Sequence, residues 1–297
     1  MKGGETMGSA PHDDSVPILD NARKTGRLPR NSVRAFQNII YSYYITHSRD
    51  FSWRRTRDPY AIFVSEIMLQ QTQTARVVKK YEGFLNIFPD FRAIAHASLE
   101  KILRAWSGLG YNRRAIALKE IANTVLKELN GSLPSSVEEL AMLPGIGKTT
   151  AAAIAAFAFD RPAVFIETNI RRVFIHFFFE GRTDVKDVEI LPLVERTLDR
   201  SNPREWYYAL MDYGAMLKKK HQNPNRRSAH YRTQRPFENS DRQVRGMILK
   251  TVIRESNLSE YEIVRRLGKS REKVQKSLVQ LEKEGFIRRR GKRVTIA

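Results

Sequence analysis

A glycine-rich turn, Leu143-Pro-Gly-Ile-Gly-Lys148, separates two apolar helical patterns. The first pattern runs from Ser136 to Met142, and an alanine-rich one follows from Thr149 to Phe159. Gly145 and Gly147 allow positive φ angles and a close approach of the backbone to a ligand. Because the first amides of a helix have no acceptor within it, they can bind an anion. The turn therefore predicts an anion-binding helical hairpin, although this segment alone also fits an ordinary corner with glycine as helix stop.

The chain is strongly basic. Its 297 residues include 52 Lys and Arg against 32 Asp and Glu, which gives a formal net charge of +20. A charge of this size favours a polyanionic partner, and nucleic acid is the commonest one. A membrane surface is the rival, but the sequence has no apolar run of about 18 residues and spreads its basic residues along the chain. We therefore expect an interaction with nucleic acid and none with a membrane.

The sequence contains no cysteine. This excludes disulfide bonds, thiolate zinc sites, cysteine nucleophiles and cysteine-ligated iron–sulfur clusters. Because the six histidines are scattered, we expect neither a metal site nor a cofactor. Residues 1–30 are polar and lack the apolar segment of a secretory signal, so we interpret them as a mostly disordered tail. These features favour a cytoplasmic protein, which as a DNA-binding protein would associate with the nucleoid.

The pattern of apolar residues divides the chain into segments. Across residues 31–220 apolar side chains recur three and four positions apart, which indicates helices, and no part of this region alternates as a strand. Residues 221–240 are basic and rich in Pro and Asn, which predicts a linker. We expect residues 241–297 to form a separate unit.

The segment 241–297 reads as three helices followed by two short strands around a basic turn: Arg242–Arg254, Ser259–Leu267, Ser270–Glu284 and Phe286–Ala297. Ser259 and Ser270 are typical helix caps. The arrangement resembles a winged helix-turn-helix, whose third helix would enter the major groove. The basic residues Arg288, Arg289 and Arg290 would then meet phosphates. A wing that binds a protein rather than DNA is the alternative.

Glu66 lies inside an otherwise apolar helical stretch, between Val64 and Ile67. A carboxylate on a mostly buried helix is costly unless it is paired or used. A half-buried glutamate can keep its proton near neutral pH and act as a general acid. The alternative is a structural ion pair with Arg54, Arg55 or Arg76.

Two amides, Gln70 and Gln71, follow this stretch directly. Such side chains can enter a DNA duplex and replace a displaced base. The alternative is that they are simply polar groups on the surface.

Five segments occur in an order that resembles a known family: Ser65-Glu-Ile-Met-Leu-Gln-Gln-Thr72, Gly108-Leu-Gly-Tyr111, Leu143-Pro-Gly-Ile-Gly-Lys148, Glu167-Thr-Asn-Ile-Arg-Arg-Val173 and Met211-Asp-Tyr-Gly-Ala-Met216. Together they resemble the helix-hairpin-helix DNA glycosylases, most closely the MutY-type adenine glycosylases, over residues 35–217. The resemblance implies an all-α fold of two helical lobes, with DNA across the cleft and the target nucleotide flipped into a pocket between the lobes.

The resemblance assigns catalytic roles to four positions. Glu66 matches the general acid that protonates the leaving purine at N7 and then helps to position water. Glu167 stands where the family has the aspartate that stabilises the oxocarbenium-like sugar, and its extra methylene moves the carboxylate. Asn169 matches a supporting polar residue. Thr149 stands where bifunctional relatives such as endonuclease III carry a Schiff-base lysine, so we expect little or no lyase activity.

The resemblance also assigns residues to DNA binding. Gln70, Gln71 and Tyr111 match side chains that probe the duplex. Gly145, Gly147 and Lys148 match the hairpin that grips a phosphate.

Two departures concern whole segments. The loop after Met216 carries four cluster-ligating cysteines in the family, but here Lys218 to Arg235 contains none, and its basic residues would hold DNA without a metal scaffold. The family's C-terminal domain, which reads 8-oxoguanine, is replaced by the unit at 241–297. The preferred base opposite the target therefore stays open.

These features favour a monofunctional DNA glycosylase of base excision repair. It would act as a monomer on double-stranded DNA with a damaged or mispaired base, and it would hydrolyse the N-glycosidic bond of a flipped, mispaired adenine. A mismatch thymine or uracil glycosylase is one alternative, because those relatives share the pattern at Phe51–Tyr60. A glycosylase for alkylated or bulky purines is another. A non-catalytic DNA-binding regulator is the alternative from a different class.

Overall fold

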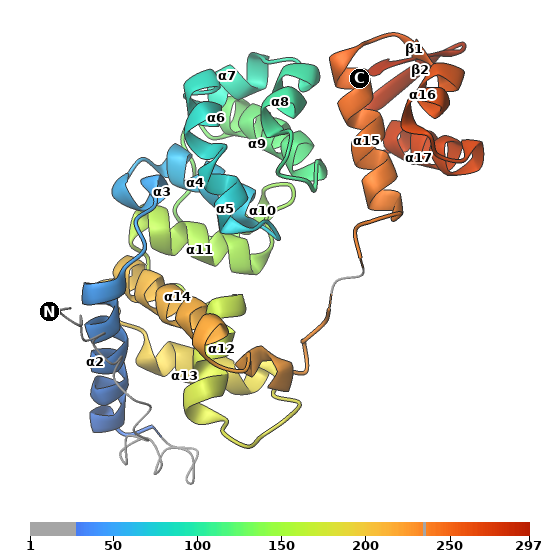
Figure 1. The fold of residues 1–297 in the computed structure, drawn as a ribbon. Helices are drawn as coiled ribbons and strands as arrows, with labels where there is room; N and C mark the ends of the chain where they lie inside the picture. The colour runs from blue at the N-terminus through green and yellow to red at the C-terminus, as the bar shows by residue number, and fades with distance from the viewer. Residues whose placement is uncertain (1–27, 234–235) are drawn as a thin grey trace, which may run out of the picture. The chain divides into compact units, whose positions relative to one another are not determined.

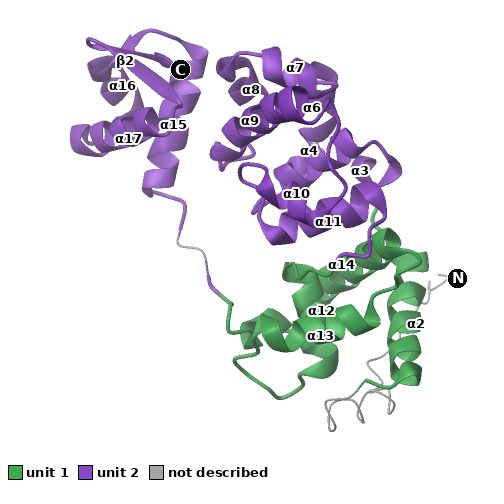
Figure 2. Ribbon diagram, turned by 180° about the vertical axis from the view of Figure 1, so that it is seen from behind, with its two compact units in different colours: residues 1–49, 164–231 green, residues 50–163, 232–297 purple. Residues whose placement is uncertain are grey.

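The computed structural model describes residues 28–233 and 236–297, which fall into two units (Figures 1 and 2). Unit 1 comprises residues 1–49 and 164–231, and unit 2 comprises residues 50–163 and 232–297. The predicted helical fold is confirmed, and the strands of the described residues form one small sheet near the C-terminus. Most of the predicted tail, residues 1–27, lies outside the described residues. Within its last three residues, Leu28 is buried and a helix begins at Arg30.

Unit 1 is built from α2 (Arg30–His47), α12 (Thr168–Phe178), α13 (Asp187–Thr197), α14 (Pro203–Lys220) and the short 3-10 helix η1 (Pro224–Arg227). Its core is aromatic, because Phe36 of α2 packs edge-on against Phe178 of α12 and Trp206 of α14, with ring centroids 5.1 and 5.8 Å away. At the end of α2, the buried carboxylate of Asp212 accepts hydrogen bonds from the amide and the Nε of Arg49, at 2.8 and 2.6 Å. These contacts join α2 to helices that follow it by more than a hundred residues.

The helical part of unit 2 contains α3 (Ser52–Arg55), α4 (Pro59–Leu69), α5 (Thr74–Val78), α6 (Tyr81–Ile87), α7 (Phe91–His96), α8 (Leu99–Trp106), α9 (Arg113–Glu128), α10 (Val137–Met142) and α11 (Lys148–Phe159). Helix α4 begins where Asp58 accepts hydrogen bonds from two backbone amides, with Pro59 at the first helical position. Most of α4 is buried, and it packs against the alanine-rich helix α11. The small alanine side chains allow the two helices to approach closely.

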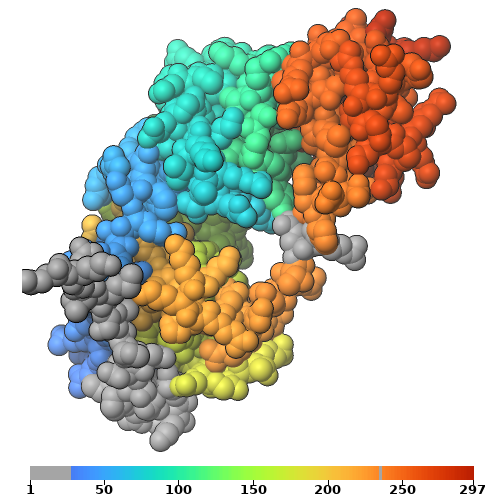
Figure 3. All heavy atoms as spheres, viewed as in Figure 1, coloured from blue at the N-terminus to red at the C-terminus, as the bar shows by residue number. Residues whose placement is uncertain are grey.

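The C-terminal segment contains α15 (Asp241–Arg254), β1 (Leu258–Ser259), α16 (Glu260–Leu267), α17 (Arg271–Lys283), β2 (Ile287–Arg290) and β3 (Arg293–Ile296). The expected caps are present, because Ser259 and Ser270 each accept a hydrogen bond from a backbone amide and Gly268 ends α16 with φ +58°. The strands pair antiparallel in the order β1-β3-β2, so the sheet has one strand more than the sequence pattern indicates. From α15 to β3 the chain forms one closely packed group of atoms, orange to red in Figure 3.

The predicted linker at 221–240 is shorter than expected. Residues 221–231 belong to unit 1, where η1 packs against α12. The amide of Val185 donates to the carbonyl of Arg227, and the amide of Ala229 donates to the carbonyl of Val185, both at 2.9 Å. Among the described residues, no helix combines the length and the apolar character needed to cross a bilayer.

One buried guanidinium organises the loops of unit 2. Arg114 of α9 is only 8% exposed, and its terminal nitrogens reach four oxygens at 2.6–3.0 Å: the carbonyls of Ile67, Met68 and Gly110 and the hydroxyl of Thr72. Burial lowers the pKa of Arg114 to about 10. The side chain therefore stays charged at neutral pH while it joins the end of α4 to the loop that follows α8.

We expect Arg114→Met to lower the free energy of unfolding by about 3–5 kcal/mol, because it leaves buried carbonyls without donors. Urea denaturation followed by circular dichroism measures this loss. The neighbouring Arg113 is exposed, so Arg113→Met is the matched control and should change stability by about 0.5 kcal/mol or less. Equal stabilities of the two variants would contradict the role given to Arg114.

Candidate active site and nucleic-acid interface

Glu66 is the exception in an otherwise buried part of α4. Its neighbours from Tyr60 to Ser65 are buried, as are Ile67 and Met68, but Glu66 itself keeps partial exposure. Arg55, one of the arginines considered as its structural partner, forms its ion pair with Asp50 instead. A carboxylate held on a rigid helix and open on one side is suited to proton transfer with a bound ligand.

Glu167 caps the N-terminus of α12. Its Oε1 accepts hydrogen bonds from the amides of Asn169 and Ile170 at 2.6 and 2.9 Å, and its Oε2 accepts one from Nδ2 of Asn169 at 3.2 Å. Burial raises the pKa of Glu167, and the two backbone amides and the charge of Arg172 oppose that shift. The side chain of Glu167, one methylene longer than the family's aspartate, thus folds back onto the N-terminus of α12. The helix dipole favours a negative charge there.

Asn169 is held from both sides. While its Nδ2 donates to Glu167, its Oδ1 accepts from the guanidinium of the buried Arg172 at 2.6 Å. The same Arg172 nitrogen donates to the carbonyl of Gly214 on α14 at 2.7 Å. A Cβ atom on Gly214 would lie 2.3 Å from the carbonyl oxygen of Asn169, so only glycine allows this approach of α14 to α12.

The predicted duplex-probing residues lie on two loops that contact each other. Gln71 and Tyr111 are both exposed and both have positive φ angles, 52° and 47°, which is uncommon for residues other than glycine. The hydroxyl of Thr72 donates to the carbonyl of Leu109 at 3.3 Å and so joins the loops. Gln70 is less exposed, and its amide nitrogen lies 3.2 Å from the hydroxyl of Thr150 on α11. Strained backbone of this kind is concentrated at functional sites.

The glycine-rich turn forms the predicted hairpin between α10 and α11. Gly145 has φ +78°, but Gly147 has an ordinary extended φ of −84° and serves as the N-cap of α11. A Cβ atom on Gly147 would meet no atom within 4 Å, so the space next to the first amides of α11 is open. Lys148 and Thr149 follow, both exposed on the first helical turn. Gly147 thus leaves room for a ligand to reach the first amides of α11, and it does not serve to allow a positive φ angle.

The three arginines of β2, Arg288, Arg289 and Arg290, do not all have the same surroundings. Strand β2 alternates, so that Arg288 and Arg290 are exposed, whereas Arg289 pairs with Glu282 at 2.7 Å and with Glu260 at 3.2 Å. These carboxylates raise the pKa of Arg289. We therefore revise the prediction for Arg289, which stabilises its own domain, and retain Arg288 and Arg290 as phosphate contacts.

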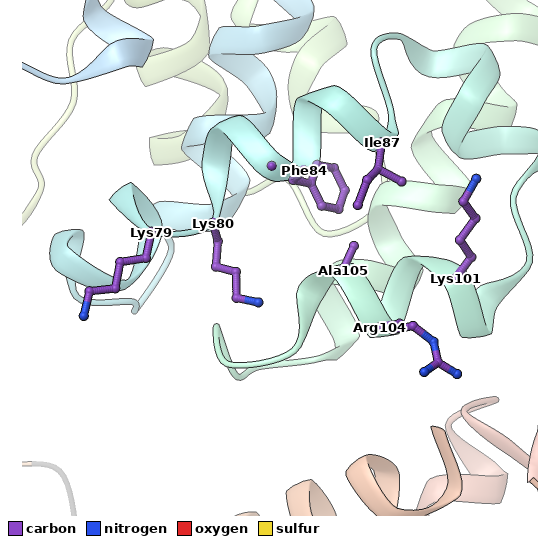
Figure 4. A pocket seen from close by; sticks show the side chains of 8 residues that line it. Lys79, Lys80, Phe84, Ile87, Lys101, Arg104 and Ala105 are labelled. Carbon is purple, nitrogen blue, oxygen red and sulfur yellow. The ribbon is translucent and has the colours of Figure 1, made fainter. Parts of the chain in front are cut away.

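Unit 2 also has an open hollow of about 500 Å³ with a basic rim (Figure 4). Its lining comprises Lys79, Lys80, Gly83, Phe84, Ile87, Lys101, Arg104 and Ala105. In Figure 4 the cationic ends of the lysines and of Arg104 lie around the apolar side chains of Phe84, Ile87 and Ala105. The hollow adds positive charge near the loop at Gly108, where a Cβ atom would lie 3.6 Å from Cε of Lys80.

The site residues thus form two groups, one in each unit. Unit 2 carries Glu66, Thr149, the probing loops and the hairpin, and unit 1 carries Glu167 and Asn169. Sequence reasoning missed Arg114, Arg172 and Gly214, which hold these groups in place. Within residues 28–233 and 236–297, no three His, Asp or Glu side chains cluster as metal ligands would.

We expect Gly214→Ala to lower the free energy of unfolding by about 1–3 kcal/mol, because α14 must move away from α12. Gly246 of α15 is the matched control, since a Cβ atom there meets nothing within 4 Å. Gly246→Ala should raise stability by about 0.4–1 kcal/mol. Denaturant titration of both variants compares the signs, and a neutral or stabilising Gly214→Ala would refute the close packing.

Comparison with known proteins supports a common fold and family. The family model "HhH-GPD superfamily base excision DNA repair protein" matches residues 64–192. Among solved structures, a thermostable thymine-DNA glycosylase is similar, with a TM-score of 0.57, 28% identity, and coverage of 65% of this chain and 90% of that one. A trapped endonuclease III–DNA covalent intermediate has a TM-score of 0.51 at 21% identity over 64% of this chain and 86% of that one, which supports the fold alone.

The match with this chain spans different shares of three curated relatives, and it spans less than two thirds of the two adenine DNA glycosylases. The human adenine DNA glycosylase is 36% identical over 197 residues, which are 62% of this chain and 36% of the human protein. The adenine DNA glycosylase of Mycobacterium tuberculosis is 36% identical over 202 residues, with coverage of 64% and 65%. The thymine/uracil-DNA glycosylase of Methanothermobacter thermautotrophicus is 32% identical over 188 residues, with coverage of 62% and 85%. With most of this last relative matched, the chain belongs to the HhH-GPD superfamily of base excision DNA repair proteins.

Proposed function

We propose that this protein is a monofunctional DNA glycosylase that hydrolyses the N-glycosidic bond of a flipped base, with mispaired adenine as the leading substrate. The observation that carries the proposal is the partly exposed Glu66 in the buried helix α4. The loop that directly follows α4 carries Gln71, whose φ angle is positive. A proton donor next to residues suited to entering a duplex is what base excision requires.

In this proposal the two carboxylates have different roles. Glu66 protonates the leaving base and so makes it a better leaving group. Glu167 supplies negative charge where positive charge develops on the sugar. Its ionised form is favoured by the amides of Asn169 and Ile170 and by the charge of Arg172, against the effect of burial.

The absence of lyase activity is part of the proposal. A lyase needs an amine that attacks the sugar, and Thr149 occupies the position of that lysine in bifunctional relatives. Lys148 is one residue earlier, about 100° around the helix. Its side chain therefore projects from a different face of α11 than that of Thr149.

Adenine specificity is supported by Gln70 and Gln71, whose segment Ser65–Thr72 is one of those that resemble the MutY-type adenine glycosylases. A specific observation supports thymine or uracil as the second candidate, because the matched archaeal thymine/uracil-DNA glycosylase is covered over 85% of its length. Both substrates are bases opposite a wrong partner in double-stranded DNA. We infer that the protein acts as a monomer and that it associates with the nucleoid in the cytoplasm.

Several surfaces would contribute to DNA binding. The open amides after Gly147 would hold a phosphate, and the basic hollow at Lys80 would add attraction near the probing loops. Arg288 and Arg290 on β2 would provide further phosphate contacts. The net charge of +20 supports this distribution of cations over several elements.

Base release from labelled duplexes tests the proposal. The duplexes carry A opposite 8-oxoguanine, A opposite G, T opposite G, U opposite G, or an alkylated purine. We expect strand breaks only after hot alkali, and we expect Glu66→Gln to slow release by about 100- to 10,000-fold while the duplex is still bound.

Glu128→Gln is the matched control, because Glu128 is an exposed carboxylate at the end of α9. It should leave the rate unchanged. Tight binding without release from any duplex would favour a DNA-binding regulator instead, and strand breaks without alkali would refute the monofunctional mechanism.

The wing makes a separate prediction about salt. The double variant Arg288→Ala/Arg290→Ala should lower the slope of log affinity against log salt by about two units on an undamaged duplex, because each phosphate contact contributes about one. Arg289→Ala should leave the slope unchanged and lower the melting temperature, since it breaks ion pairs with Glu260 and Glu282. Fluorescence anisotropy at several salt concentrations distinguishes them, and the opposite pattern would show that Arg289 meets the DNA.

A further inference from the structure

The loop that follows α14 is where the resemblance places the ligands of an iron–sulfur cluster. This chain has no cysteine, so the residues present do not fit such a cluster. The loop is nevertheless structured around η1 and packs against α12, the helix that begins at Glu167. Its side chains form hydrogen bonds with residues of α12 and with the carbonyl of Phe179 just after it.

Two asparagines of the loop contact the N-terminal half of α12. Asn225 is 5% exposed, and its amide nitrogen donates to the carbonyl of Thr168 at 2.8 Å. The side-chain oxygen of Asn223 accepts from the amide of Asn225 at 3.2 Å and from Nε of Arg172 at 3.0 Å. A carbonyl oxygen has two lone pairs, so Asn223 satisfies its own loop and the buried arginine together.

The other end of α12 is held by Arg227. Its guanidinium donates to the carbonyls of Phe179 at 2.6 Å and Ile175 at 3.2 Å. The carbonyls of Ile175 and Phe179 also accept backbone amides, from Phe179 at 3.3 Å and from Arg182 at 3.2 Å respectively, and the helix dipole favours a cation at this end of α12. Arg227 is therefore used inside the fold, whereas its neighbour Arg226 is exposed.

Hydrogen bonds continue from the loop to the carboxylate. Asn223 holds Nε of Arg172, another nitrogen of Arg172 holds Oδ1 of Asn169, and Nδ2 of Asn169 holds Oε2 of Glu167. Arg172 is 3% exposed, so little freedom remains at the centre of this chain of contacts. A shift of its guanidinium would be passed on to Asn169.

We propose that Asn223 is a positioning residue that, through Arg172 and Asn169, sets the orientation and ionisation of Glu167. The loop at residues 221–231 thereby braces α12 with side chains and without a metal. This inference rests on the proposed glycosylase function of Glu167. Asn223 itself does not touch the reacting atoms.

Two substitutions separate geometry from charge. Asn223→Ala removes the oxygen that accepts both hydrogen bonds and leaves Nε of Arg172 without this acceptor, so the single-turnover rate of base release should fall by about ten- to a hundredfold with unchanged affinity for the duplex. Asn223→Asp keeps an oxygen that can accept both hydrogen bonds but adds a negative charge beside Arg172. Because the charge of Arg172 lowers the pKa of Glu167, its partial neutralisation should raise that pKa, and the acid limb of the pH–rate profile should move to higher pH.

The experiment is single-turnover base release by the full chain at saturating enzyme, measured from acid to neutral pH. Gln222→Ala is the matched control, because this exposed, uncharged side chain of the same loop should leave both the rate and the acid limb unchanged. Circular dichroism checks that each variant is folded. If Asn223→Ala is unfolded, the shift of the acid limb in Asn223→Asp decides the question.

An active wild type with an unaltered rate in Asn223→Ala and an unaltered acid limb in Asn223→Asp would overturn the positioning role alone. An inactive wild type would overturn the proposed function together with it. Elemental analysis of the purified protein provides a readout besides activity. Stoichiometric iron in the folded protein would overturn the metal-free brace, and its absence supports the brace.

Discussion

The buried guanidinium of Arg172 is the interaction on which unit 1 depends most. It joins three segments that are separate in sequence: α12 through Asn169, α14 through the carbonyl of Gly214, and the loop through Asn223. A buried charge is costly unless its hydrogen bonds are satisfied, and here the neighbouring carboxylate of Glu167 also balances it. The hydrogen bonds that satisfy the buried guanidinium of Arg172 also fix Asn169, which in turn holds the carboxylate of Glu167. The stability of unit 1 and the proposed chemistry therefore depend on the same contacts.

Much of the fold could be predicted from local patterns. The glycines and proline at 143–148 indicated the hairpin, the serines at 259 and 270 indicated helix starts, and the lone carboxylate at Glu66 in an apolar helix indicated a functional side chain. The hairpin and the helix starts are confirmed because capping and helical periodicity act over a few residues, whereas the functional role of Glu66 stays a prediction. The partial exposure of Glu66 fits this logic.

The rest depends on contacts between distant segments, which no local pattern reveals. The role of Arg289 follows from the alternation of β2 and from carboxylates on α16 and α17. The partners of Arg114 are backbone carbonyls on two loops, and carbonyls have no sequence signature. Asn223 lay in a segment interpreted as a linker, because its composition is that of one. The candidate catalytic residues are thus easier to recognise in the sequence than the residues that hold them.

Unit 1 combines the first described helix with segments that begin at Val164. The amide of Gln37 bonds the carbonyl of Thr197, and the hydroxyl of Tyr41 bonds Asp199, 160 and 158 residues away along the chain. During synthesis α2 must therefore wait on the order of ten seconds for its partners. Residues 50–163 are contiguous, although their unit is completed only by residues 232–297. The contiguous segment that carries Glu66 is therefore synthesised in full before Val164, where the segments that carry Glu167 begin, so the ribosome delivers the two carboxylates in a fixed order.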